Sequence, residues 1–313
     1  FIVNTGAQSG ILDMTGSSAS IDVAGSWTCN GTFNVGSSTV TLSGTTKNIT
    51  TSGSSNFKNL RIIGTYTAQN ALDIDGNMTI SGGTFTPGTF AHKVGGNWDD
   101  SAGTFIQTSG SVTFDNLSGA QTITTDTGTT NNRFYNLTIG DGVNKPAVSV
   151  TAGDDVEAAN NLTINTDSSL TLNANLAHSV GGTLTISAPT SGTTELEVAT
   201  SKMEVAGALT NSGRLDLAAT ASTSQGIKCV GLTSTGTMVG GTGTFECNGN
   251  WSNTGSFTVG SSTVKIGGTN PTIRADAASS DFYNLTISAA ASMNGAAANG
   301  LDIDNALVIE SGK

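Results

Sequence analysis

The chain has 313 residues, of which 36% are apolar, so it is long enough and hydrophobic enough to form a sizeable core. Its 41 glycines and only four prolines favour many short strands joined by tight turns, and they argue against a mainly helical protein. The formal net charge of -11 repels phosphate backbones and anionic membrane surfaces, so we expect no nucleic acid among its partners.

Three copies of one sequence module follow one another along the chain, near residues 24–83, 95–168 and 248–313. Each copy begins at a tryptophan, reaches a phenylalanine after five or six further residues, continues with a strand-like segment and ends in a segment such as FYNLTI. The stretch VGSSTV is identical in the first and third copies. We expect the recurring aromatic residues to fill a bend inside the fold. They are Trp27, Trp98 and Trp251, with Phe57, Phe134 and Phe282.

A shorter period of about 20 residues lies within the module. Segments of the type N-L-T-I recur in three pairs with about this separation, and their first residues are Asn59 and Asn77, Asn136 and Asn161, and Asn284 and Asn305. In such segments apolar residues alternate with Thr, Ser or Lys, which predicts strands with one buried face. We expect each of these asparagines at a corner of the coil, where stacked copies form a hydrogen-bonded ladder.

These patterns predict an all-β fold, a parallel β-helix (β-solenoid) with about 20 residues per coil, running as a single continuous solenoid through residues 1–313. Right-handed crossovers dominate parallel sheets, so we expect a right-handed coil. Tandem Ig-like β-sandwiches are the alternative. The recurring coil spacing and the absence of a paired Cys and Trp pattern disfavour them.

The two ends of the chain resemble consecutive parts of the same repeat. Residues 309–313 (IESGK) joined to Phe1 read like residues 80–85 (ISGGTF), and LDID stands upstream of both, at Leu72 and Leu301. The first residues contain neither an initiator methionine nor a signal-peptide pattern, and no apolar run approaches the roughly 20 residues that cross a bilayer. We therefore expect one segment of a longer repetitive chain or filament, without a membrane-spanning segment.

Candidate catalytic groups are sparse, and the carboxylates that stand out come in pairs: Asp73/Asp75, Asp302/Asp304, Asp99/Asp100 and Asp154/Asp155. Alternation places both members of each of the first two pairs on one strand face, which suits acid–base catalysis or a weak calcium site. Their recurrence within the repeat favours solvated edge positions instead. The adjacent members of the other two pairs point to opposite faces or lie in loops.

We therefore expect no catalytic, cofactor-binding or metal site, no cofactor and no enzyme activity. His92 and His178 are far apart and stand beside no nucleophile pattern, which favours surface or corner positions. A carbohydrate-active β-helix enzyme is the alternative in a different functional class. It requires one groove in which three or more carboxylates and a basic residue converge.

Cysteine and asparagine add two further hypotheses. Cys29, Cys229 and Cys247 match no zinc spacing, which favours buried thiols. The separation of Cys229 and Cys247 is close to the coil length, so a second hypothesis places them on adjacent coils within disulfide reach. In an exported protein the eight N-x-S/T sites are candidate glycan acceptors, at Asn30, Asn48, Asn77, Asn116, Asn136, Asn161, Asn250 and Asn284.

The Trp-to-FYNLTI pattern resembles the repeat regions of very large bacterial or archaeal surface proteins, among them filamentous-haemagglutinin-like adhesins and autotransporter passengers. The resemblance covers nearly the whole chain. It implies an extracellular or cell-surface filament or adhesin stalk whose β-solenoid units stack end to end, with other copies of itself and cell-surface or matrix glycans as partners. A phage tailspike-like receptor-binding protein remains an alternative, and it predicts a trimer with apolar side faces.

Overall fold

The structure, a computed structural model, describes residues 2–3, 10–51, 56–116, 119–125, 133–150, 154–172, 176–217, 225–275, 282–293 and 301–310. Within these ranges the regular secondary structure is entirely β-strand, and neighbouring strands of successive coils pair in parallel. The chain is therefore a β-solenoid, as predicted, whereas Ig-like sandwiches have antiparallel sheets. The same ranges contain no helix long and apolar enough to cross a membrane.

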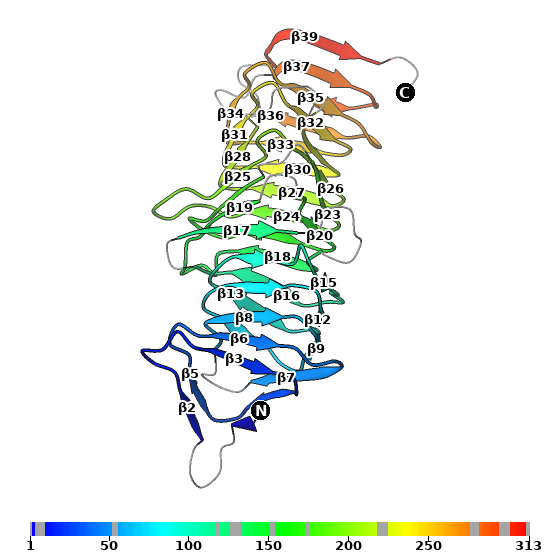
Figure 1. The fold of residues 1–313 in the computed structure, drawn as a ribbon. Coiled ribbons are helices and arrows are strands. Elements are labelled where there is room, and N and C mark those ends of the chain that lie inside the picture. Colours follow the sequence, from blue (N-terminus) through cyan, green and yellow to red (C-terminus); the bar gives the residue numbers. More distant parts are fainter. Residues whose placement is uncertain are drawn as a thin grey trace. The chain divides into compact units, whose positions relative to one another are not determined.

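Two compact units divide the chain, Phe1–Val148 (unit 1) and Ser149–Lys313 (unit 2). The boundary falls within β19 (Ala147–Val150). Each unit is built from coils whose strands lie one above another (Figure 1).

Unit 1 contains three sheets and one separate strand pair in its described part. Sheet 1a comprises β1 (Ile2–Val3), β4 (Trp27–Cys29), β7 (Lys47–Thr51), β9 (Thr65–Ala68), β12 (Thr84–Thr86) and β15 (Thr104–Phe105). Sheet 1b comprises β3 (Ser20–Val23), β6 (Thr39–Leu42), β8 (Asn59–Ile62), β11 (Met78–Ile80), β14 (Trp98–Asp99) and β17 (Ala120–Thr124). Sheet 1c comprises β10 (Asp73–Ile74), β13 (Ala91–Val94), β16 (Ser111–Phe114) and β18 (Asn136–Ile139), and the separate pair is β2 (Ile11–Asp13) with β5 (Thr32–Asn34).

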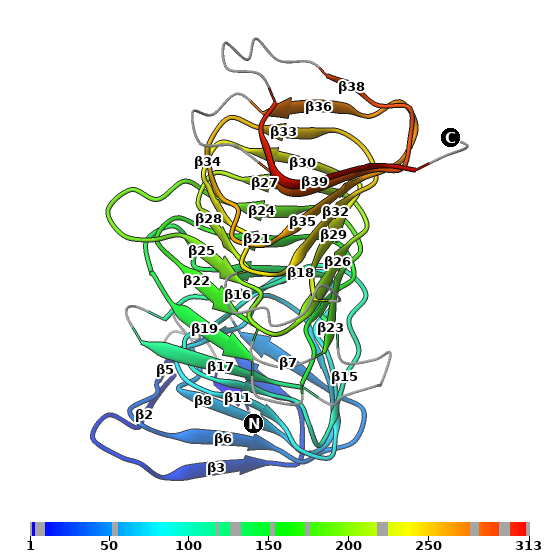
Figure 2. The same ribbon diagram turned by 90° about the horizontal axis from the view of Figure 1, so that it is seen from above.

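Unit 2 passes through three sheets in turn (Figure 2). Sheet 2a comprises β20 (Glu157–Ala158), β23 (Ala177–Val180), β26 (Lys202–Val205), β29 (Gly226–Cys229), β32 (Thr244–Cys247), β35 (Thr263–Ile266), β37 (Phe282–Ile287) and β39 (Ile303–Ile309). Sheet 2b comprises β21 (Leu162–Ile164), β24 (Leu184–Ile186), β27 (Ala208–Asn211), β30 (Gly231–Ser234), β33 (Trp251–Asn253), β36 (Thr272–Ala275) and β38 (Ser292–Met293). Sheet 2c comprises β22 (Ser169–Thr171), β25 (Glu195–Glu197), β28 (Arg214–Asp216), β31 (Thr237–Val239) and β34 (Ser256–Thr258).

The coil length is close to the predicted value but varies from coil to coil. One column of sheet 1b shows the variation, because Leu60 pairs with Met78, Met78 with Trp98 and Trp98 with Ile123. Each of these steps along the chain is longer than the one before it. The extra residues lie outside the strands, so the register of the apolar positions is kept.

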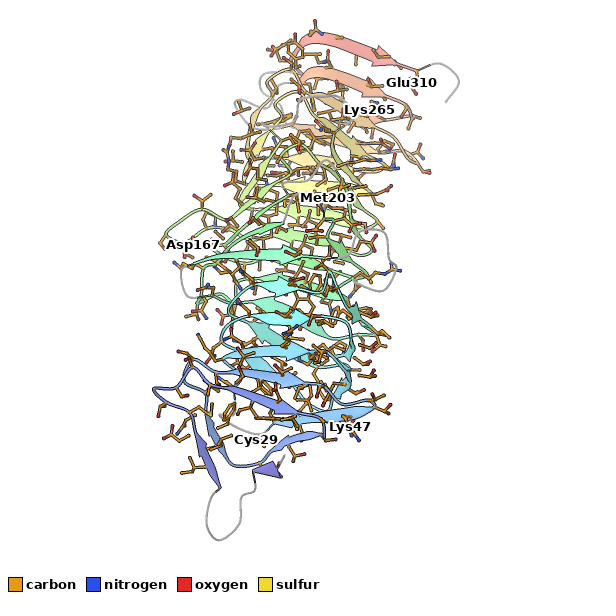
Figure 3. All side chains as sticks on the ribbon, viewed as in Figure 1. Cys29, Lys47, Asp167, Met203, Lys265 and Glu310 are labelled. Carbon is orange, nitrogen blue, oxygen red and sulfur yellow. The ribbon has the colours of Figure 1, made fainter. Side chains whose placement is uncertain are left out.

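Alternation along each strand separates an apolar interior from a polar exterior, as predicted. One inward column of sheet 2a consists of Met203, Ile227, Phe245, Val264 and Leu285, all of them buried. The outward column beside it consists of Glu204, Lys228, Glu246 and Lys265. Met203 and Lys265 are labelled in Figure 3 as members of the two columns. Each fully buried aliphatic side chain contributes about 1.5–3 kcal/mol relative to an exposed one.

The aromatic residues of the modules lie in the interior, as predicted. Trp98 contacts Phe105 and Phe134, with ring centroids 4.8 and 5.2 Å apart, and both phenylalanines are buried. The first and third copies repeat this cluster, with Trp27 against Phe33 and Phe57 and with Trp251 against Phe257 and Phe282. Each module therefore supplies the components of one aromatic cluster.

In all three modules, strands of the same copy pair with each other in successive coils, and they do so in the same way. The tryptophan lies beside an isoleucine of its own copy one coil later, in the pairs Trp27 with Ile49, Trp98 with Ile123 and Trp251 with Ile273. The strand-like segment likewise pairs with the N-L-T-I type segment, as Val40 with Leu60, Val112 with Leu137 and Val264 with Leu285. Within unit 1, however, Trp27 belongs to sheet 1a and Trp98 to sheet 1b. Successive modules thus begin at different corners of the coil.

The predicted asparagine ladder is present at one corner of unit 1. The Oδ1 atom of Asn59 accepts a hydrogen bond from the backbone N–H of Asn77 at 3.0 Å, and Asn77 accepts one from Asn97 at 2.9 Å. Asn97 in turn accepts one from the backbone N–H of Thr122. Each side chain therefore accepts a hydrogen bond from a backbone N–H of the next coil. That N–H lies just before the residues that pair between strands, so the asparagine supplies its hydrogen-bond acceptor.

A column of glycines forms another corner of unit 1. The carbonyl oxygens of Gly44, Gly64 and Gly83 accept 2.8 Å hydrogen bonds from Thr65, Thr84 and Thr104, each one coil further on. A Cβ atom at Gly64 would lie 2.0 Å from the oxygen of Gly44, and one at Gly83 would lie 2.0 Å from the oxygen of Gly64. Glycine is needed here because the backbones of successive coils approach too closely for a side chain.

Candidate functional site: a carboxylate groove in unit 1

Sheet 1c brings charged residues of successive coils together on its outer face. Asp73 pairs with Lys93 in the strand register, and both point outward because their neighbours Ile74 and Val94 are buried. Backbone hydrogen bonds continue this ladder beyond the paired residues. The N–H of Gly95 donates to the carbonyl oxygen of Ile74 at 2.7 Å, and the N–H of Asp115 donates to the carbonyl oxygen of Val94 at 3.1 Å. The stacking of coils thus places Asp75 and Asp115 at the same edge of the sheet.

These residues surround a groove with a volume of about 620 Å³. The lining residues are Lys58, Asp73, Asp75, Lys93, Gly95, Asp115, Asn116 and Asn144. Three carboxylates and two ammonium groups therefore face one cavity. This is the arrangement that a carbohydrate-active β-helix enzyme requires.

Lys93 is the central cation of the groove. Its Nζ atom lies 3.2 Å from Oδ2 of Asp115 and 3.1 Å from Oδ2 of Asp141. Asp141 also accepts hydrogen bonds from the backbone N–H groups of Val143 and Asn144, at 2.9 and 2.7 Å, which hold the turn after β18. One lysine thus bridges carboxylates from two successive coils.

The carboxylates of the cluster have different protonation equilibria. Desolvation raises the pKa of Asp115 above its ordinary value, although Lys93 opposes the shift. Desolvation also raises the pKa of Asp73, and repulsion from Asp115 and Asp75 adds to it. At Asp141 burial acts in the same direction, but the hydrogen bonds from Asn144, Val143 and Lys93 outweigh it and lower the pKa. Carboxyl groups whose pKa values are separated in this way can divide acid and base roles.

The other predicted carboxylate pairs do not form such a site. Asp302 and Asp304 are both exposed, as the solvated-edge interpretation predicts. Asp99 ends β14 and is partly exposed, whereas Asp100 directly after the strand is buried, so the two side chains point to opposite sides, as expected. The described residues contain no cluster of three or more His, Cys, Asp or Glu side chains that could hold a metal ion.

The prediction of surface or corner histidines is wrong, because His92 and His178 are 3% and 1% exposed. Each imidazole Nδ1 accepts a hydrogen bond from a backbone N–H just before a short strand of the preceding coil, at Leu72 for His92 (3.2 Å) and at Val156 for His178 (2.9 Å). The Nε2 of His92 also lies 2.9 Å from the carbonyl oxygen of Pro87. Burial lowers the pKa of His92, although this contact with Pro87 opposes the shift.

Asp167 is a buried carboxylate with a structural role. It has a φ of 58° and lies beside the loop of residues 187–193 (Figure 3). Its oxygens accept hydrogen bonds from the backbone N–H groups of Thr190, Ser191 and Gly192, at 2.9, 3.1 and 2.9 Å. The hydroxyl groups of Thr190 and Ser191 also donate to it. These bonds fix the loop and satisfy the carboxylate.

Sequence reasoning identified Asp73 and Asp75 but assigned them to solvated edges, and it missed Asp115, Asp141 and Lys93. These three residues belong to no recognisable motif. Their only signal is a spacing of whole coils from the LDID segment, about one coil for Lys93, two for Asp115 and three for Asp141. No family model, curated protein or solved structure matches this chain. The stacking and the groove geometry are therefore the basis for the functional proposals.

Proposed function

We propose that this chain is a structural segment of an extracellular filament or adhesin stalk, in which β-solenoid units stack end to end. The observation that supports this role is the uncovered interior at β39. Leu307 continues the inward column of Leu285, which is 0% exposed, yet Leu307 is 49% exposed. Ile309 likewise continues the column of Ile287 and is 70% exposed. Among the described strands, only β37 pairs with β39.

A further solenoid coil suits this surface better than a loop or a globular partner. The free edge of β39 offers backbone donors and acceptors in the spacing of a parallel strand, and the open columns offer apolar contacts at the same time. The match between residues 309–313 joined to Phe1 and residues 80–85 supports the start of another copy of this sequence as the source of that coil. Phe1 and residues 311–313 lie outside the described residues.

Substituting Leu307 with lysine tests end-to-end stacking. Burial of one leucine contributes about 1.5–3 kcal/mol, so we expect L307K to weaken self-association roughly ten- to a hundredfold. Val308 is the matched control, because it pairs with Thr286 in the outward column, and V308K should associate like the wild type. Sedimentation velocity over a concentration series measures the association, and negative-stain electron microscopy shows its shape. Monodisperse single particles of the wild type at every concentration would reject the proposal.

The carboxylate groove supports a second candidate function, acid–base hydrolysis of a polysaccharide. Asp115, which lines the groove and has a raised pKa, is suited to the role of acid. Asp141, which is not a lining residue but contacts the lining residue Lys93 and has a lowered pKa, is suited to that of base. Lys93 contacts both carboxylates. This function belongs to a single site on unit 1 and is independent of end-to-end stacking.

Release of reducing ends from a panel of polysaccharides tests the second candidate. If it holds, the wild type releases reducing ends and D115N does so at least about a hundredfold more slowly, because it has lost the acid. D302N is the control, since Asp302 is exposed and lies outside the groove. Absence of any release by the wild type, or equal rates for D115N and the wild type, would reject this second candidate function.

A further inference from the structure

Two cysteines of unit 2 lie directly against each other in adjacent coils. Cys229 ends β29 and Cys247 ends β32, and these strands are neighbours in sheet 2a (Figure 2). Their parallel register pairs the two cysteines. Their side chains are 3% and 0% exposed, so both point into the interior. Neighbouring strands lie about 4.8 Å apart, which falls within the range of roughly 4.4–6.8 Å that a disulfide requires between Cα atoms.

The two thiol groups also interact with each other. A hydrogen bond to Cys247, together with burial, raises the pKa of Cys229, and the same bond lowers the pKa of Cys247. Cys247 is therefore the first of the pair to ionise and the stronger candidate for a nucleophile. Its sulfur also lies 3.2 Å from the carbonyl oxygen of Asn250, which holds the side chain in the interior.

We propose that Cys229 and Cys247 form a covalent disulfide cross-link between adjacent coils when the protein folds in an oxidising compartment. The oxidant is a low-molecular-weight disulfide. The thiolate of Cys247 attacks one sulfur of that disulfide and releases its other half as a thiolate. Cys229 then loses its proton and attacks the sulfur of Cys247, which releases the second small thiol. Two protein thiols are oxidised, the small disulfide is reduced to two thiols, and two protons pass to the released groups.

Cys29 provides an internal comparison for this site. It is buried like the other two cysteines, but its register neighbours are Val3 in β1 and Thr51 in β7. The structure therefore singles out one cysteine pair among the three thiols. The cross-link closes a loop of one coil, and it lies in the interior column next to Ile266. This inference does not depend on end-to-end stacking or on the carboxylate groove.

The test refolds the wild-type chain in a buffer of oxidised and reduced glutathione and then denatures it in the presence of an alkylating reagent. We expect one alkylated cysteine, Cys29, and a peptide pair joined through Cys229 and Cys247 that is two hydrogen atoms lighter than the reduced peptides. Refolding under a reducing agent should give three alkylated cysteines. The oxidised form should also unfold at a temperature several degrees higher.

Two variants keep the result interpretable. In C247A the sulfur partner is absent, so Cys229 and Cys29 should both be alkylated after the same oxidative refolding. C29A should retain the cross-link, because Cys29 takes no part in it. Three alkylated cysteines in the oxidatively refolded wild type, or a bond that joins Cys29 to either of the others, would overturn the proposal.

Discussion

Replacing Trp98 with alanine is expected to destabilise unit 1 by about 3–5 kcal/mol, the usual loss for a large aromatic side chain removed from a core. Trp98 is 2% exposed and lies between Phe105 and Phe134, so its removal leaves a cavity that two other aromatic rings line. Phe134 in turn contacts Phe114 of the adjacent strand at 6.2 Å. The loss therefore extends to the contacts of more than one coil.

Urea denaturation followed by far-ultraviolet circular dichroism measures this change. The matched control is Ile106→Ala, because Ile106 follows Phe105 directly but is 41% exposed, and its loss should stay within about 0.5 kcal/mol. A loss below about 1 kcal/mol for W98A would contradict the interior position of the aromatic cluster.

Gly64→Ala is the second substitution with a large expected effect. Its Cβ atom would meet the carbonyl oxygen of Gly44 at 2.0 Å and the carbonyl carbon of Ser43 at 2.7 Å, so the two coils must separate. Separation weakens the hydrogen bonds that Gly44 and Gly64 accept from the coils above them. We expect a loss of about 3 kcal/mol, at the upper end of the range for overpacked sites, because backbone atoms cannot move aside as a flexible side chain can.

Gly25→Ala is the control for the glycine column, because no atom beyond Gly25 and its two chain neighbours lies within 4 Å of the position that its Cβ would occupy. We expect its free energy of unfolding to stay within about 0.5 kcal/mol of the wild type. Thermal unfolding of both variants measures the difference. Equal midpoints for G64A and G25A would show that successive coils do not approach as closely as the structure indicates.

Much of the fold could be predicted from the sequence because one coil determines the next. The alternation at Val40 and Leu42 and the tryptophan spacing each depend on local chemistry, and stacking then repeats that chemistry along the axis. The asparagine ladder followed for the same reason. Its donors and acceptors are the same atoms in each coil, so a repeated asparagine predicts a repeated bond.

The candidate site was harder to predict because it depends on the register between coils. Asp75 and Asp115 are two coils apart, and the coil length is not constant, so the sequence alone does not determine which outward residues face one another. The buried histidines have a similar cause. His92 occupies an inward position beside Val112, and its two imidazole nitrogens contact the backbone N–H of Leu72, in the preceding coil, and the carbonyl oxygen of Pro87.

The self-pairing of each module has a consequence for how such a chain changes in length. Because Trp27 meets Ile49 and Val40 meets Leu60 within one copy, a duplicated or deleted copy carries its own contacts with it. Recombination between copies therefore preserves the packing of the segment that moves, whereas a break inside a coil shifts the alternation and turns apolar residues outward. Gene-level expansion and contraction by whole modules is thus the change that this architecture tolerates best.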